Sequence, residues 1–134
     1  ITGEGKMTRD FTYVMDIVEA LMLAGFSEKA IGEEMNIASA REIEIVHVAE
    51  TINKLTGNKA GLVYSDRRKW DTKSRLLASI DRAKDLLGYD PQTTFEEGLS
   101  RTIQWYKKNW DDINRDAEFP PGMSSAVKNY LLKH

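Results

Sequence analysis

The 134-residue sequence predicts an α/β protein, because segments with strand-like patterns alternate along the chain with segments that have helical spacing. Side chains alternate between two faces over residues 9–14, as in a short strand. Residues 17–24 then form an apolar run that suits a buried helix. Short apolar runs at residues 35–38 and 61–64 are also typical of strands. The length allows one domain with a modest core.

The first strand and helix are predicted to be joined by a sharp turn. Asp16 stands directly before the apolar run, where an aspartate side chain accepts hydrogen bonds from the free N–H groups of a helix and acts as its N-cap. Gly25 follows the run and is expected to end the helix in the left-handed conformation. The strand would place Arg9 at one end of this rigid strand-turn-helix unit.

Apolar residues recur with helical spacing in two later segments, residues 45–55 and 80–87. Gly57 and Gly88 follow these segments and are expected to end the two helices. Such glycines take the left-handed conformation without the steric cost of a side chain.

A last helix is predicted to begin near residue 95, because Thr94 and Glu97 have the spacing of a capping box. The ordered pattern ends at Phe119-Pro120-Pro121-Gly122. We therefore expect a domain over residues 1–118 and a C-terminal tail over residues 119–134.

The composition excludes several classes of protein. Lys and Arg number 19 against 21 Asp and Glu, and a net charge of -2 argues against a general nucleic-acid binder. There is no cysteine, which excludes disulfides and thiolate metal sites. His47 has no ligand-type neighbours, so no metal site is expected. No apolar run approaches the ~20 residues of a membrane span, and a cytoplasmic setting is the default expectation.

Five segments, in a fixed order, resemble the signature of one enzyme family. They are Gly3-x-Gly5-x-x-x-Arg9-Asp10-Phe11-x-Tyr13-Val14-x-Asp16, Asn36-Ile37-Ala38-Ser39, Arg68-x-x-Asp71, Ile80–Tyr89 and Phe95–Trp105. Together they resemble the second half of extended short-chain dehydrogenases/reductases that act on nucleotide sugars, the NAD-dependent epimerases and dehydratases. Ala38 and Trp70 stand where that family usually has glycine.

The resemblance also indicates what this sequence lacks. Family members begin with a glycine-rich turn that holds the pyrophosphate of NAD, and they use a catalytic Tyr-x-x-x-Lys. Neither motif occurs here. The implied fold is the small C-terminal, substrate-binding portion of such an enzyme, without the main NAD-binding Rossmann half. This chain alone would bind no cofactor and hold no catalytic residue, whereas the parent enzyme would use NAD.

Arg9, Arg68 and Asp71 are the substrate-binding residues that the resemblance implies. The two arginines would bind the diphosphate of a nucleoside-diphosphate sugar, because the guanidinium group presents a planar fork of donors to phosphate. Asp71 would accept hydrogen bonds from ribose hydroxyls. The residues alone also allow ordinary ion pairs, between Arg9 and Asp10 and between Asp71 and either Arg68 or Arg67.

Two functions remain open from the sequence. The first is the substrate-binding portion of an NAD-dependent nucleotide-sugar epimerase or dehydratase, whose sugar, base and reaction the sequence does not define. The second is a free-standing, non-catalytic binding module derived from that fold. The helix at residues 17–24 is apolar around most of its circumference. We therefore expect it to be covered by the missing N-terminal Rossmann domain or by self-association.

Overall fold

The computed structural model describes residues 1–70 and 72–116. Contacts between residues divide the chain into two units, Ile1–Arg101 and Thr102–His134. Asp71 and the expected tail at residues 119–134 lie outside the described residues. The α/β class is confirmed, because the first unit combines a small sheet with several helices.

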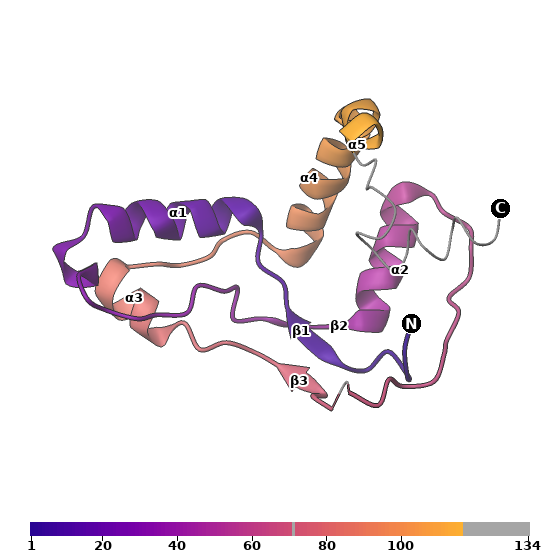
Figure 1. Ribbon diagram of the computed structural model, residues 1–134, viewed down its shortest axis with the longest axis horizontal. Helices are drawn as coiled ribbons and strands as arrows, with labels where there is room; N and C mark the ends of the chain where they lie inside the picture. Colours follow the sequence, from indigo (N-terminus) through magenta and orange to yellow (C-terminus); the bar gives the residue numbers. More distant parts are fainter. Residues whose placement is uncertain (71, 117–134) are drawn as a thin grey trace. The chain divides into compact units, whose positions relative to one another are not determined.

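Strand β1 (Thr8–Asp10) lies at the centre of a three-stranded sheet with the order β2-β1-β3 (Figure 1). Strand β2 (Glu42–Glu44) pairs with it antiparallel, and strand β3 (Arg75–Leu76) pairs with it parallel. Arg9 lies opposite Ile43 on one side and Leu76 on the other. The strands are too short to bury a large face, so side-chain contacts must supply much of what holds this sheet together.

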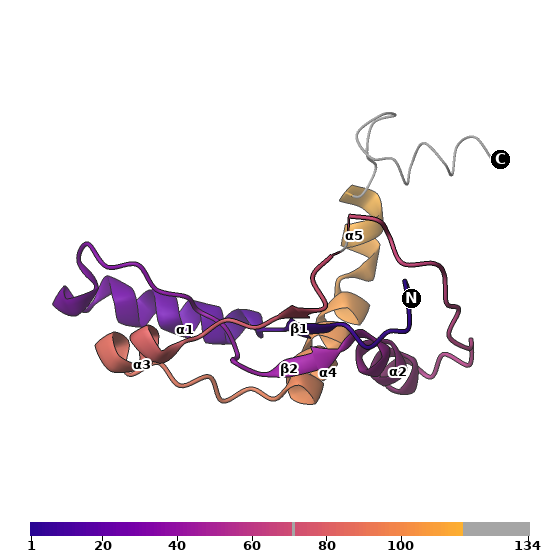
Figure 2. The same ribbon diagram turned by 90° about the horizontal axis from the view of Figure 1, so that it is seen from below.

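The hydrophobic core lies where α1 (Val14–Gly25) packs beside α3 (Asp81–Leu87), with the short 3-10 helix η1 (Glu28–Ala30) between them in the chain. Figures 1 and 2 show these two helices side by side. The buried apolar residues of this core are Ala20, Ala38, Ile80, Ala83 and Tyr89. Four of the five have small or aliphatic side chains, and Tyr89 is the large one that fills the space between them.

Helix α2 (Ile45–Thr56) follows β2 directly, and α4 (Phe95–Lys108) begins after a loop. The N–H of Glu97 donates to Oγ1 of Thr94 over 3.3 Å, which confirms the predicted cap. Gly98 allows the side chain of Tyr13 to lie against the helix, since a Cβ there would be 3.2 Å from it. His47 on α2 contacts Oε1 of Glu96 at 3.0 Å.

In the second unit, the last turns of α4 are followed by α5 (Trp110–Asp116). The rings of Trp105 and Tyr106 meet edge to face with centroids 5.3 Å apart. Nδ2 of Asn109 donates to the carbonyl of Trp105 over 2.8 Å, which satisfies a carbonyl near the end of α4.

The glycine predictions succeed at two of three helix ends. Gly57 and Gly88 are left-handed, with φ of 71° and 69°. The prediction for Gly25 is wrong, because α1 includes it and ends before Phe26, whose φ is -105°. The N-cap prediction for Asp16 is also wrong. Tyr13 is the N-cap residue, and Asp16 lies buried in the first turn, where its Oδ1 accepts a hydrogen bond from Oγ1 of Thr93 over 2.7 Å.

The strands predicted at residues 35–38 and 61–64 are also wrong. Residues 35–38 form no ladder with any described part of the chain, although Ala38 is buried. Residues 61–64 run as irregular chain and lead only to an isolated parallel bridge between Ser65 and Thr2. Ala38 is buried whereas Val63 is 80% exposed, so an apolar run by itself determines neither burial nor a strand, which requires a partner in register.

Candidate functional site

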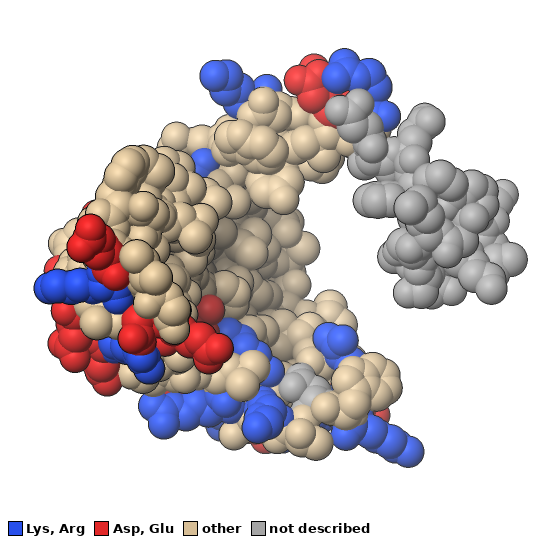
Figure 3. Space-filling view, turned by 60° about the vertical axis from the view of Figure 1, so that its left-hand side comes forward, with Lys and Arg blue, Asp and Glu red and all other residues tan. Residues whose placement is uncertain are grey.

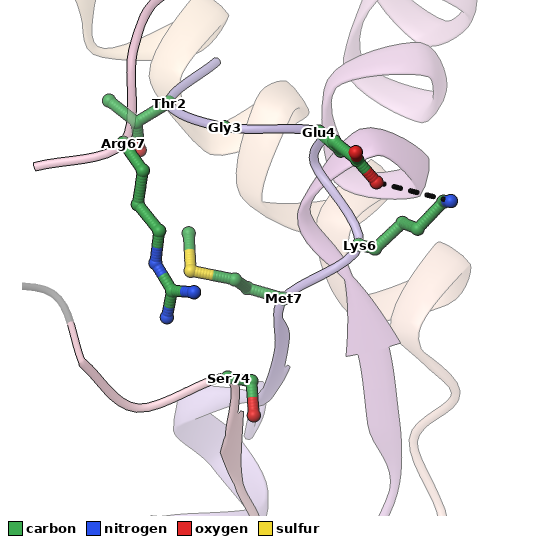
Figure 4. A pocket seen from close by; sticks show the side chains of 7 residues that line it. All are labelled: Thr2, Gly3, Glu4, Lys6, Met7, Arg67 and Ser74. Carbon is green, nitrogen blue, oxygen red and sulfur yellow. Dashed lines mark ion pairs between the residues drawn. The ribbon is translucent and has the colours of Figure 1, made fainter.

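A pocket of about 340 Å³ opens beside the segment that leads into β1. This volume lies at the lower end of the range typical of small-ligand sites. The residues that line it come from two segments far apart in sequence (Figure 4). They are Thr2, Gly3, Glu4, Lys6, Met7, Arg67 and Ser74.

The backbone fixes these two segments against each other at both ends. The N–H of Gly3 donates to the carbonyl of Ser65 over 2.8 Å, and the N–H of Ser65 donates to the carbonyl of Ile1 over 2.8 Å. At the other end, the N–H of Thr8 donates to the carbonyl of Ser74 over 2.9 Å. The described stretches of this wall, residues 65–70 and 72–74, are therefore each bonded to the β1 segment, through Ser65 and Ser74.

Gly5 is required by the path of the chain on the β1 side. Its φ of +74° is one that side chains rarely allow, and an added Cβ would lie 2.9 Å from Cβ of Val46 on α2. Gly5 thus lets the segment turn sharply between Glu4 and Lys6, two residues of the pocket wall.

Arg67 provides the charge that faces the pocket. Figure 4 shows its side chain extending across the opening toward Met7 and Ser74. Glu4 and Lys6 point in the other direction and pair with each other at 3.2 Å. Met7 gives the pocket an apolar wall, and Thr2 and Ser74 are the residues of its lining with hydroxyl groups.

Arg9 is placed on β1, next to the pocket but outside the residues that line it. One nitrogen of its guanidinium group donates to the carbonyl of Thr8 over 2.7 Å, and the other donates to the carbonyl of Lys73 over 3.3 Å. These bonds hold the half-buried side chain against the loop that precedes β3. The adjacent Asp10 accepts hydrogen bonds from Ser39 and Ala40.

Arg68 is exposed on the same loop as Arg67 and is not among the described residues that line the pocket. The structure thus brings Arg67, rather than its neighbour Arg68, to the pocket wall. Asp71 lies outside the described residues. The sequence assigns Arg67 no ligand role, because it falls outside the motif match. No sequence pattern shows in which direction the side chains of two adjacent arginines point.

The loop and the start of β3 are strongly basic. Lys and Arg side chains gather along the lower edge of the face shown in Figure 3. The segment from residue 66 to 75 contributes five exposed cations, which are Arg67, Arg68, Lys69, Lys73 and Arg75. A surface with this density of positive charge attracts anionic ligands.

Glu42 ties all three strands together on one face of the sheet. Its Oε1 accepts hydrogen bonds from Oγ1 of Thr8 on β1 and from Nε of Arg75 on β3, both over 2.7 Å. The hydrogen bond from Arg75, followed by that from Thr8, lowers the pKa of Glu42 below its ordinary value. Because β3 follows Ser74 directly, Glu42 helps to hold one side of the pocket wall in place.

This arrangement predicts a specific pH dependence. The pKa of Glu42 is lower in the folded protein, so its stabilising effect is complete above the ordinary glutamate pKa of about 4.3 and is lost as the pH falls through the lower folded value. The melting temperature, measured from pH 7 down to pH 3, should fall less steeply with pH for Glu42→Gln than for the parent protein. Glu50→Gln, on the exposed side of α2, is the matched control, and its melting temperature should depend on pH as that of the parent protein does.

The described residues give no sign of a metal centre or a membrane segment. No group of three or more His, Asp or Glu side chains among them is arranged to hold a metal ion. Within residues 1–70 and 72–116, no helix combines the length and apolarity that a membrane crossing requires.

Comparison with known proteins gives three consistent findings. The family model of GDP-mannose 4,6-dehydratase matches residues 1–102. The UDP-glucuronate 4-epimerase of Thermodesulfobacterium geofontis is 38% identical over 111 residues, which are 81% of this chain and 33% of that enzyme. Among solved structures, the epimerase Mth375 of Methanothermobacter thermautotrophicus matches with 51% identity and a TM-score of 0.82, covering 86% of this chain and 34% of that one.

A further solved structure shows ligands bound to a similar protein. A variant of the UDP-glucuronic acid 4-epimerase of Bacillus cereus, in complex with NAD and UDP-4-deoxy-4-fluoro-glucuronic acid, matches with 28% identity and a TM-score of 0.71. The match covers 81% of this chain and 34% of that one. This chain therefore spans about a third of the length of the relatives that it matches.

Proposed function

The chain belongs to the NAD-dependent extended short-chain dehydrogenase/reductase family, and we propose that it is the C-terminal, substrate-binding portion of a nucleotide-sugar epimerase or dehydratase. The observation that carries this proposal is the pocket beside β1, which has an arginine facing it and Arg9 on the adjoining strand. We further propose that residues 1–118 form the binding domain, that residues 119–134 are a tail and that the enzyme is cytoplasmic.

The redox chemistry belongs to the rest of the enzyme in this proposal. The residues of this chain do not fit an NAD site, because Gly3 and Gly5 precede a strand, whereas the cofactor turn requires glycines at the start of a helix. NAD in the whole enzyme would take up and return a hydride. This chain would bind the nucleoside diphosphate and so present the sugar in a fixed orientation.

Arg9 and Arg68 are proposed to bind the diphosphate, and Asp71 the ribose hydroxyls, as in the family motif. Arg9 is suited to this role because its backbone hydrogen bonds at 2.7 and 3.3 Å already orient the guanidinium group. A pre-oriented side chain loses less conformational entropy when the ligand binds.

Alanine at Arg9 or Arg68 should weaken binding of UDP-glucose by about tenfold to a hundredfold, because a charged hydrogen bond contributes roughly 1.5–3 kcal/mol. Lysine at Arg68 should restore only part of the affinity, since a point charge does not reproduce the fork. Isothermal titration of the protein expressed from its complete open reading frame measures both effects. Lys69→Ala, adjacent and exposed, is the control. Equal losses for Lys69→Ala and Arg68→Ala would mean a diffuse basic surface instead of a diphosphate site.

The partner proposed for this chain is the Rossmann half that the relatives contain and this sequence does not. Helix α1 exposes a row of large apolar side chains, as the sequence predicts for an incompletely covered helix. They are Val14, Met15, Val18, Leu21 and Met22. Since the chain spans about a third of its relatives, the remaining two thirds of such an enzyme is the proposed occupant of this face.

Leu21→Asp should therefore abolish association with the separately expressed upstream segment. Its effect on the unfolding of this chain should be small, because Leu21 is 65% exposed. Analytical ultracentrifugation of the mixture measures the association, and Lys29→Asp on η1 is the control for added negative charge. Unchanged association of Leu21→Asp would contradict the proposed surface. A monomeric 134-residue chain that binds UDP without any upstream segment would favour the free-standing module.

A further inference from the structure

We propose that residues 66–75, called here the basic stretch, increase the rate at which an anionic nucleotide sugar reaches the pocket beside β1. In this proposal Lys69 and Lys73 attract the ligand from a distance and do not contact it. The inference rests on the proposed function, since it adds a role in the rate of binding to the same nucleotide-sugar site. It depends on the net charge of the basic stretch and on the position of that stretch at the pocket.

The basic stretch keeps an excess of positive charge after the acids within it and the partner of Arg75 are counted. In the sequence it contains five Lys and Arg residues and two aspartates, Asp66 and Asp71, which gives a net charge of +3. Glu42 pairs with Arg75 at 2.7 Å and lowers the excess to +2. The whole chain has a net charge of -2, so the residues outside this group carry -4. The excess therefore requires no arginine to be without a partner.

The basic stretch borders the pocket. Arg67 and Ser74, near its two ends, belong to the pocket lining. The backbone bonds of Ser65 and Ser74 attach these two ends to the β1 segment, so the positive charge stays beside the opening. Lys69 and Lys73 are exposed and are not among the described residues that line the pocket. Their charges therefore lie close enough to attract a ligand without belonging to the pocket wall.

The surrounding charges do not cancel this excess. Figure 3 shows Lys and Arg side chains gathered along the lower edge of the face, whereas acidic and basic side chains are mixed over its left-hand part. Glu4 and Lys6, which also line the pocket, pair at 3.2 Å and add no net charge. The diphosphate of a nucleotide sugar is negatively charged, so the basic stretch attracts it and the acidic remainder of the chain repels it. A local field of this kind raises the association rate of an anionic ligand by about tenfold to a thousandfold.

The test measures the association and dissociation rates of UDP separately. Stopped-flow mixing uses a fluorescent N-methylanthraniloyl derivative of UDP and the protein expressed from its complete open reading frame. The parent protein is compared with Lys69→Gln/Lys73→Gln. At low salt, about 0.01 M, the screening length is about 30 Å. There the double variant should bind about threefold to tenfold more slowly, with a dissociation rate changed by less than about twofold. At about 1 M salt, where the screening length is about 3 Å, the two association rates should agree within about twofold.

Lys29→Gln/Lys84→Gln is the matched control, because it removes the same amount of charge from elsewhere. Lys29 lies on η1 and Lys84 on α3, away from the basic stretch (Figures 1 and 2). The association rate of this variant should match that of the parent protein. Equal losses for the two double variants would mean that the overall charge sets the rate, and the inference would fail.

The outcomes separate this inference from the proposed function. If the parent protein binds UDP at a rate that does not depend on salt, the proposed function stands and the inference fails. Faster dissociation of Lys69→Gln/Lys73→Gln with an unchanged association rate would show that the lysines contact the ligand, which also overturns the inference. The same holds if this variant binds UDP at the parental rate but loses association with the separately expressed upstream segment, which would then be the partner of the basic stretch. If the parent protein binds no UDP, the proposed function and the inference both fail.

Discussion

Replacing Tyr89 with alanine is expected to lower the free energy of unfolding by about 3–5 kcal/mol, the cost of removing a large side chain from a core. Tyr89 is fully buried and is the largest side chain of that kind in the described chain. Its neighbours in the core include Ala20, Ala38 and Ala83, whose short side chains cannot move to fill the space that the ring leaves.

The hydroxyl group of Tyr89 makes a smaller, separable contribution. It donates to the carbonyl of Ala38 over 3.1 Å. Burial, followed by the charges of Asp16, Glu19 and Asp10, raises the pKa of Tyr89. Tyr89→Phe should cost about 1–3 kcal/mol, because it leaves that carbonyl buried without its donor.

Urea unfolding followed by circular dichroism measures both changes. Tyr64→Ala is the control, because that tyrosine is 51% exposed and its loss should cost less than about 1 kcal/mol. A loss for Tyr89→Ala no larger than for Tyr64→Ala would show that the contacts of Tyr89 do not hold α1 and α3 together.

Asp10→Ala is expected to have the second largest effect on stability, about 2–4 kcal/mol. The Oδ1 atom of Asp10 accepts from the N–H and the hydroxyl of Ser39 at 3.0 and 2.6 Å, and Oδ2 accepts from the N–H of Ala40 at 3.0 Å. Hydrogen bonds to a charged group each contribute about 1.5–3 kcal/mol, and they are not additive within one carboxylate. Removing the carboxylate leaves the N–H groups of a tight loop without their acceptor.

The same loop contains a strained residue that Asp10 holds in place. Ala40 has φ of +55°, which a residue with a Cβ adopts at a cost of roughly 1 kcal/mol. Ala40→Gly should therefore preserve or slightly raise the stability. The stability of Asp10→Asn should lie between that of the parent protein and that of Asp10→Ala. The melting temperatures of the three variants measure this order. A stable Asp10→Ala variant would mean that the loop does not depend on the carboxylate.

Local signals in the sequence predicted the helices well. Gly57 and Gly88 end α2 and α3 as expected, because glycine adopts the left-handed conformation without the steric cost of a Cβ. The cap at Thr94 depends on residues only three positions apart. Asp16 failed as a cap because its side chain is bonded to Thr93, a partner 77 residues away that no local pattern reveals.

The strands and the pocket were less predictable, because they too depend on partners that are distant in the sequence. The apolar run at residues 35–38 resembles a strand, but no described segment supplies its hydrogen-bonding partner. The direction of Arg67 depends on the bridge between Ser65 and Thr2, which joins residues 63 positions apart. Family motifs located the loop that borders the pocket, while the path of that loop determines that Arg67, and not Arg68, lines the described pocket wall.

The backbone attachments of Ser65 and Ser74 to the β1 segment affect how much sequence change the stretch between them tolerates. Because Ser65 and Ser74 are each bonded to that segment, the two ends of this stretch stay fixed when the sequence between them changes. Doubling the length of such a loop costs only about 0.6 kcal/mol of closure entropy. Insertions and exchanges between these two attachments can therefore change one wall of the pocket at little cost in stability, while the pairing of β1 with β2 and β3 is retained.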